Sequence, residues 1–178
     1  MTEFTQNSST IIVVGNRFSA FAEAIGAITL GEFLSKTAHE LRNYDTVIVG
    51  QGVGWHAIHA LYANIGLLLE SGQLTLIENA SALVSPGTVH KQRMENVMVT
   101  HPKAVSEHRF VSHLVVDENC AELSDHITGI HMQGTLFIEA ARQMFMASSV
   151  RYVKELSHQN HVYTLQRVQV GFKNFLYP

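Results

Sequence analysis

Cysteine and charge are scarce in this sequence, and each scarcity excludes a class of protein. The 178 residues include one cysteine, Cys120, so no internal disulfide framework can form. Cys120 lies in a polar stretch without a C-x-x-C partner, which suits a reducing cytosol and argues against a catalytic thiol. Charged residues make up 15% of the chain and the formal net charge is −3, so the sequence lacks the basic surface that binds nucleic acid.

Long apolar runs are also missing. No stretch offers the roughly 18 uninterrupted apolar residues of a membrane span. Residues 1–10 are polar and lack the basic and apolar regions of a signal peptide. Hydrophobic residues nevertheless make up 46% of the chain, which is enough for a sizeable folded core. We therefore expect a globular cytoplasmic protein of one ordinary or two small domains, with no nucleic acid and no membrane among its partners.

Strand-like and helix-like segments alternate in the first half of the chain. The expected strands cover residues 11–15, 46–50 and 74–77, and the expected helices cover residues 19–25, 30–42 and 55–70. Such alternation is typical of a parallel α/β layer, and continuously apolar strands suit a sheet that is covered on both faces. The pattern predicts a small Rossmann-like α/β unit over residues 1–86, with a linker at 81–88 that contains a Pro-Gly pair.

A glycine-rich loop follows the second expected strand. Residues 50–54 read G-Q-G-V-G, which is not the G-x-G-x-x-G spacing of dinucleotide sites, and Trp55 stands where a small residue would help. No Walker lysine accompanies the loop, so we expect a tight structural turn and no cofactor. His56 and His59 lie one helical turn apart but lack a third ligand, so we expect no metal site.

An apolar helix, expected over residues 135–150, carries three large polar side chains. Glu139, Arg142 and Gln143 stand at relative positions i, i+3 and i+4, which places them on one face. Burying a carboxylate and a guanidinium costs several kcal/mol per ion unless the ions are paired or functional. The group is therefore either a structural ion pair or a site for chemistry on a carbonyl group, and the residues alone leave both interpretations open.

The segment before this helix suits carbonyl chemistry. Gly134 stands where the helix would begin, and backbone N–H groups at a helix start favour developing negative charge. His131 and His126 precede Gly134, and histidines near a carboxylate can assist proton transfer.

Two separated motifs resemble a known family. The pattern H-x-x-G from His131, followed by E-A-A-R-Q from Glu139, is similar to the helix start of the A-factor (γ-butyrolactone) biosynthesis hotdog family, which is related to β-hydroxyacyl-ACP dehydratase-type hotdog proteins. V-H-K from Val89, followed by the strand-like residues 95–100, is similar to the opening strand of that family. The resemblance covers roughly residues 88–178.

The resemblance implies an α+β hotdog domain over residues 87–178, in which an antiparallel sheet wraps a long central helix. The residue pattern itself predicts strands at 95–100, 108–116 and 162–172 and a helix that ends near residue 156. A hotdog usually has further strands after the last of these, so we expect the domain to be incomplete at its C-terminus. The chain would then be a homodimer or part of a longer polypeptide.

The resemblance also implies an acyltransferase. It would transfer a β-ketoacyl group from an acyl-ACP or acyl-CoA thioester to a hydroxyl of a small phosphorylated triose. Glu139 is the candidate base, with a pKa that burial raises and Arg142 lowers, and His131 and His126 are candidate catalytic partners. The candidate substrate-binding residues are Gly134, Arg142, Gln143, His90 and Lys91.

Two alternatives remain. One is a β-hydroxyacyl-thioester dehydratase or a thioesterase, but the dehydratase pattern has a histidine about fourteen residues before the helix carboxylate, where this chain has Asp125 and His126 is one place off. A non-catalytic acyl-binding or assembly module is the other alternative, and an open helix face around Glu139 would favour it.

Overall fold

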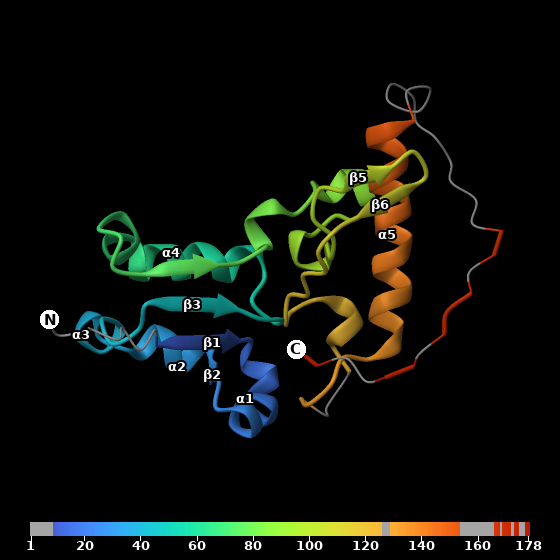
Figure 1. The fold of residues 1–178 in the computed structure, drawn as a ribbon. Coiled ribbons are helices and arrows are strands. Elements are labelled where there is room, and N and C mark those ends of the chain that lie inside the picture. Colours follow the sequence, from blue (N-terminus) through green and yellow to red (C-terminus); the bar gives the residue numbers. More distant parts are fainter. Residues whose placement is uncertain (1–8, 126–128, 154–165, 168, 172, 175–176) are drawn as a thin grey trace, which may run out of the picture.

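The computed structural model of the chain describes residues 9–125, 129–153, 166–167, 169–171, 173–174 and 177–178. In Figure 1, a parallel sheet with its helices lies on one side and the long helix α5 (Gly134–Tyr152) on the other. The arrowheads of β1 and β3 point toward α5, and residues of the segment 80–125 lie between the sheet and this helix. The carboxyl ends of the central strands therefore face the second half of the chain.

Four parallel strands form the sheet, in the order β2-β1-β3-β4. Their bounds are β1 Thr10–Val14, β2 Ile28–Thr29, β3 Thr46–Val49 and β4 Thr75–Ile77. Val13, Val14 and Val47 are fully buried, as their continuously apolar strands predict. The three predicted strands are confirmed, while β2 has two residues and is too short to produce a periodic signal. The Rossmann-like assignment of this unit stays a prediction.

Two of the three predicted helices are confirmed at the same bounds, and the third is divided. The helices of this half are α1 Ser19–Ile25, α2 Leu30–Ser35, α3 Ala38–Leu41 and α4 Trp55–Glu70. The single helix predicted at 30–42 is wrong, because two capping boxes start two separate helices. The hydroxyl of Thr29 accepts the N–H of Glu32, and the hydroxyl of Thr37 accepts the N–H of Glu40. Lys36 is extended between them and ends the first helix.

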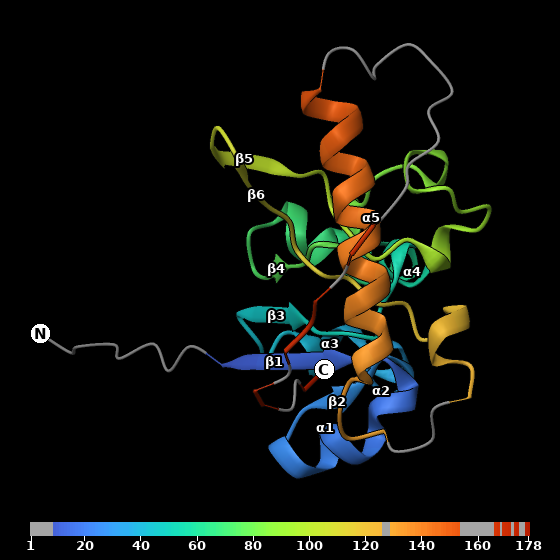
Figure 2. The same cartoon turned by 90° about the vertical axis from the view of Figure 1, so that its right-hand side faces the viewer.

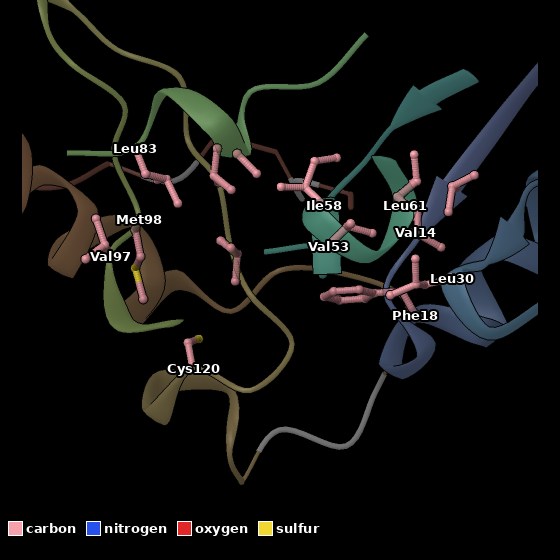
Figure 3. Close-up of a cluster of buried hydrophobic side chains, with 14 of the residues drawn as sticks. Val14, Phe18, Leu30, Val53, Ile58, Leu61, Leu83, Val97, Met98 and Cys120 are labelled. Atoms are coloured by element: carbon pink, nitrogen blue, oxygen red, sulfur yellow. The ribbon is translucent and has the colours of Figure 1, made fainter. Parts of the chain in front are cut away.

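Residues 80–125 are mostly irregular, with four short 3₁₀ helices. These are η2 Ala80–Ala82, η3 Pro86–Val89, η4 Met94–Asn96 and η5 Ala121–Leu123. The stretch 81–88, predicted as a linker, packs into the interior, since Leu83 and Val84 are buried. Figure 3 shows that side chains of both halves, such as Phe18 and Met98, belong to one hydrophobic cluster. The predicted division into residues 1–86 and 87–178 stays a prediction.

Antiparallel pairing is sparse in the described part of the chain. β5 (Lys103–Ser106) and β6 (Arg109–Val111) form a hairpin, so β5 lies between the predicted strands 95–100 and 108–116, and the second of these strands is much shorter than predicted. Figures 1 and 2 show the hairpin beside the C-terminal part of α5, where the rings of Phe110 and Tyr152 stack 4.8 Å apart.

The strand predicted at 95–100 is wrong. Residues Met94–Asn96 form η4, and the extended residues after it make isolated bridges between Leu83 and Thr100 and between Val99 and Leu114. A sheet that wraps α5 is not found among the described residues, and the predicted strand 162–172 lies partly outside them. The wrapping sheet therefore stays a prediction.

Helix α5 confirms the predicted central helix, although it ends at Tyr152 rather than near residue 156. One face packs on the 80–125 segment and buries Leu136, Gln143 and Met146. The opposite face leaves Ile138 and Phe145 exposed by 42% and 43%. None of the described helices combines the length and apolar character needed to cross a membrane.

Candidate functional site

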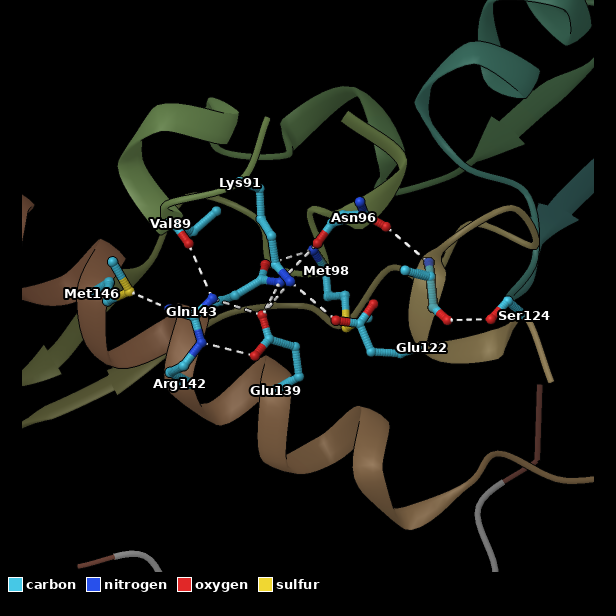
Figure 4. Close-up of polar contacts among 11 residues, drawn as sticks. Val89, Lys91, Asn96, Met98, Glu122, Ser124, Glu139, Arg142, Gln143 and Met146 are labelled. Atoms are coloured by element: carbon cyan, nitrogen blue, oxygen red, sulfur yellow. Dashed lines mark hydrogen bonds and ion pairs between the residues drawn. The ribbon is translucent and has the colours of Figure 1, made fainter. Parts of the chain in front are cut away.

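Five side chains from three segments meet beside the first half of α5 (Figure 4). Glu139, Arg142 and Gln143 project from α5, as their spacing predicts. Lys91 follows η3, and Glu122 lies on η5. We call these five residues the Glu139 cluster.

The carboxylate of Glu139 is the centre of the Glu139 cluster. Arg142 donates to both of its oxygens, from Nε to Oε2 at 2.8 Å and from Nη2 to Oε1 at 2.7 Å. Lys91 Nζ lies 2.9 Å from Oε1, and Gln143 Nε2 donates to the same oxygen at 3.0 Å. The side chain of Glu139 is 17% exposed, so most of this carboxylate is satisfied by protein donors rather than by water.

The surroundings of Glu139 lower its pKa. Burial by itself would raise the pKa, but the hydrogen bonds from Arg142, Gln143 and Lys91 outweigh it and bring the pKa to about 2. Burial and Arg142 act in the two directions expected, and the net shift of the pKa is downward because the fold adds Lys91 and Gln143 as further donors. Glu139 is ionised at neutral pH and binds protons weakly.

Gln143 is fully buried and joins α5 to the irregular segment. Its Nε2 donates to the carbonyl of Asn96 at 2.8 Å, and its Oε1 accepts the N–H of Met98 at 2.8 Å. The backbone just after this point pairs with another segment, since the N–H of Val115 donates to the carbonyl of Met98 and the N–H of Thr100 donates to the carbonyl of His113. The Gln143 amide therefore ties α5 to the backbone of residues 96–98.

Lys91 bridges two carboxylates. Its Nζ lies 3.0 Å from Glu122 Oε1 and 2.9 Å from Glu139 Oε1. Burial lowers the pKa of Lys91, but its hydrogen bonds to Glu139 and Glu122 raise it further, and the net change is upward. The lysine is therefore a cation, and it lies at the partly exposed border of the Glu139 cluster.

The structure brings together four of the predicted site residues, which are Lys91, Glu139, Arg142 and Gln143. Gly134 and His131 lie at the start of α5 and just before it, away from the Glu139 carboxylate along the chain. His90 precedes Lys91 as an exposed residue with a left-handed backbone. His126 lies outside the described residues.

Sequence reasoning missed Glu122. It belongs to a polar stretch around Cys120 that shows no helical or strand periodicity, and no spacing rule connects it with Lys91 or Glu139. Cys120 itself is fully buried, and burial raises the pKa of its thiol to about 11, which suits a packing residue. Among the described residues, no group of three His, Cys, Asp or Glu side chains could hold a metal ion.

The glycine loop lies at the carboxyl edge of the parallel sheet. Gly52 has φ +90°, and a Cβ there would lie 2.6 Å from the Cα of Gly15. A Cβ at Gly54 would lie 1.9 Å from Asp117 Oδ2. Close packing therefore accounts for both glycines.

Acidic side chains of the chain itself occupy this edge, where ligands of open α/β sheets usually bind. Asp117 lies against Gly54 at the start of α4. Glu118 accepts the N–H of Arg17 and the side-chain amide of Asn16, both at 3.0 Å. A phosphate bound here would need backbone N–H donors but would meet these two carboxylates instead. This favours the interpretation of the loop as a tight structural turn.

Together, the fold and site define an α+β protein whose long helix holds a partly buried ion-pair cluster against an irregular segment. The comparison with protein families is more specific. The model of the A-factor biosynthesis hotdog domain matches residues 72–174, more than half of the chain, and the chain belongs to this family. The search of curated proteins and the search of solved structures gave no match.

Proposed function

We propose that the chain is an acyltransferase that moves a β-ketoacyl group from an acyl-ACP or acyl-CoA thioester to a hydroxyl of a small phosphorylated triose. Membership of the A-factor biosynthesis family supports this class of reaction. The observation that carries the proposal is the convergence of Lys91 on Glu139 and Arg142, because it joins both segments that resemble the family in one polar site.

Lys91 and Arg142 are the proposed binding groups for the anionic acceptor. Their side chains are 18% and 33% exposed, so both reach solvent while remaining held by Glu139. A guanidinium and an ammonium together suit a phosphate, the first through its planar fork and the second as a point charge. Glu139 holds the two cations in place, and Gln143 holds Glu139.

The reaction needs a base and an oxyanion site. The acceptor oxygen attacks the thioester carbonyl carbon, the C–S bond breaks, and the hydroxyl proton has to reach the departing sulfur. The N–H groups at the start of α5, around Gly134, are the proposed site for the oxyanion. His131 and His126 are close to this helix start in sequence and stay candidates for proton transfer.

The experiment supplies the full chain with a β-ketoacyl-CoA or β-ketoacyl-ACP donor and dihydroxyacetone phosphate. We expect thiol release together with an ester product of the corresponding mass. Glu139→Gln should lower the transfer rate by about 100-fold or more, because Lys91 and Arg142 lose the charge that positions them. Glu70→Gln, at an exposed position at the end of α4, is the matched control and should keep the parental rate. Full transfer by Glu139→Gln would contradict this assignment.

A non-catalytic acyl-binding module is the second candidate. The observation in its favour is that both oxygens of Glu139 are engaged by protein donors, as in a structural ion pair. In that case the chain would bind the acyl thioester without releasing thiol, and Glu139→Gln would change its stability rather than a rate.

A further inference from the structure

Glu122 contains an acceptor atom that the fold leaves unused. Its Oε1 accepts a hydrogen bond from Lys91 Nζ at 3.0 Å. Its Oε2 is buried and has no hydrogen-bond partner among the described residues. A buried carboxylate oxygen without a donor costs free energy, so such an atom needs an explanation.

A donor from a ligand explains this atom best. The nearest cation, Lys91, is already shared between Glu122 and Glu139. The side chain of Glu122 is 22% exposed, so the Glu139 cluster borders solvent on this side. Oε2 itself is covered, so a donor that enters from outside reaches it when the Glu122 side chain turns toward this exposed border, and a hydroxyl fits a single free carboxylate oxygen next to an ammonium.

Glu122 and Glu139 differ in the number of hydrogen bonds that their carboxylate oxygens already accept. Protonating Glu139 would weaken its two bonds with Arg142 as well as those with Lys91 and Gln143. Protonating Glu122 at Oε2 breaks no bond shown in the structure, and Lys91 remains bound to Oε1. Of the two carboxylates, Glu122 is the one placed to work as a base.

We propose that Glu122 is the general base of the acyl transfer and binds the acceptor hydroxyl through Oε2. This inference rests on the proposed function. The hydroxyl oxygen forms a bond to the thioester carbonyl carbon as its proton moves to Oε2. The C–S bond then breaks, and the same proton passes from Glu122 to the departing sulfur, which leaves as a thiol. Lys91 is a positioning residue that holds Glu122 beside the anionic acceptor.

The test compares the parent, Glu122→Gln, Glu122→Asp and the control Glu70→Gln, all as full chains with a β-ketoacyl-CoA donor and dihydroxyacetone phosphate. We expect Glu122→Gln to lower kcat by about 100-fold or more with a donor KM within about threefold of the parent. In the profile of kcat against pH, the decrease in rate at acidic pH (the acidic limb) should disappear in this variant, because that decrease reports protonation of the base. Glu122→Asp should keep the limb at a reduced rate, and a thermal melt of each variant checks its fold.

The outcomes separate the two proposals. Absence of thiol release and ester formation by the parent would overturn the proposed function and this inference with it. If the parent catalyses the transfer but Glu122→Gln keeps the parental rate, only the assignment of Glu122 is overturned. The same holds if the pH profile of Glu122→Gln keeps its decrease in rate at acidic pH. If Glu122→Gln does not fold, Glu122→Asp decides, since a parental rate there would also overturn the assignment.

Discussion

At the residue scale, Glu139 takes its partners from nearby and distant parts of the chain. The helical spacing i+3 and i+4 predicts the contacts of Glu139 with Arg142 and Gln143. Lys91 comes from a segment that no local pattern connects with the helix, and it adds a second cation at 2.9 Å. This extra donor is part of the reason why the pKa of Glu139 falls to about 2 instead of rising.

The first prediction concerns the pH dependence of stability. The pKa of Glu139 is lowered from its usual 4.5 to about 2 in the folded state, so the ionised carboxylate stabilises the fold above about pH 4.5. This contribution, on the order of 3 kcal/mol, should be lost as the pH falls from about 4.5 to 2. Urea unfolding of the parent and Glu139→Gln at pH 7, 4.5 and 3 measures it. The difference in unfolding free energy between the parent and Glu139→Gln should decrease as the pH falls. A difference that stays constant would contradict the lowered pKa of Glu139.

The second prediction concerns Gln143. Gln143→Leu keeps a similar volume but leaves the N–H of Met98 and the carbonyl of Asn96 without their partner. We expect a loss of about 2–4 kcal/mol in the free energy of unfolding, measured with urea, since each buried unpaired group costs about 1–3 kcal/mol. Gln73→Leu, at an exposed position, is the control and should change stability little. Equal effects of the two substitutions would contradict the bridging role.

At the element scale, features that depend on interactions within one element were predicted more accurately than features that depend on contacts between elements. The strands at the sheet centre and helix α4 were predictable, because their apolar periodicity records burial along a single element. The division of the helix at 30–42 was also present in the sequence as two Thr-x-x-Glu capping boxes. The error at 95–100 has another origin, since residues 94–96 form η4 and an amide from α5 bonds to the backbone of Asn96 and Met98.

The third prediction concerns the loop between β3 and α4. Gly52→Ala should destabilise the chain by about 1–3 kcal/mol, because the residue has φ +90° and its new Cβ would meet the backbone of Gly15. Gly66→Ala is the matched control. Gly66 lies inside α4 with open space around it, so alanine should stabilise by about 0.5–1 kcal/mol. Thermal and urea unfolding measure both variants.

A nucleotide titration completes this test. We expect no micromolar binding of NAD(P)H, ATP or flavin, since Asp117 and Glu118 line the edge where the phosphates would lie. Micromolar binding that is lost in folded Gly52→Ala would contradict the structural interpretation and favour a cofactor site.

At the scale of the whole molecule, α5 has an apolar face whose side chains are partly exposed. Ile138 and Phe145 are exposed by more than a third of their surface. An open groove of about 430 Å³ runs along this face, and Phe110, Phe145 and Val153 are among its lining residues. A face of this character usually belongs to an interface.

The fourth prediction concerns assembly. We expect the chain to form a homodimer in which this face of α5 is buried, and sedimentation at micromolar concentration should show a dimer. Ile138→Asp, at a position on this face that is 42% exposed, should shift the equilibrium toward the monomer. Leu67→Asp is the control, because Leu67 is a large apolar side chain on α4 that is 83% exposed, and it should leave the equilibrium unchanged. A monomeric parent with a cooperative melt would contradict the expectation.

The sequence by itself determined the features that depend on local order. These are the parallel strands, the long helix, its three polar side chains on one face, and two motifs specific enough to indicate the family. Such features follow from periodicity and spacing, which act over a few residues. The tertiary structure decided the placement of Lys91 and Glu122 beside Glu139, the direction of the Glu139 pKa shift, and the bonds of Gln143 to the backbone of Asn96 and Met98. Those features depend on contacts between segments 17 to 48 residues apart in the sequence, and only the packed fold brings such segments together.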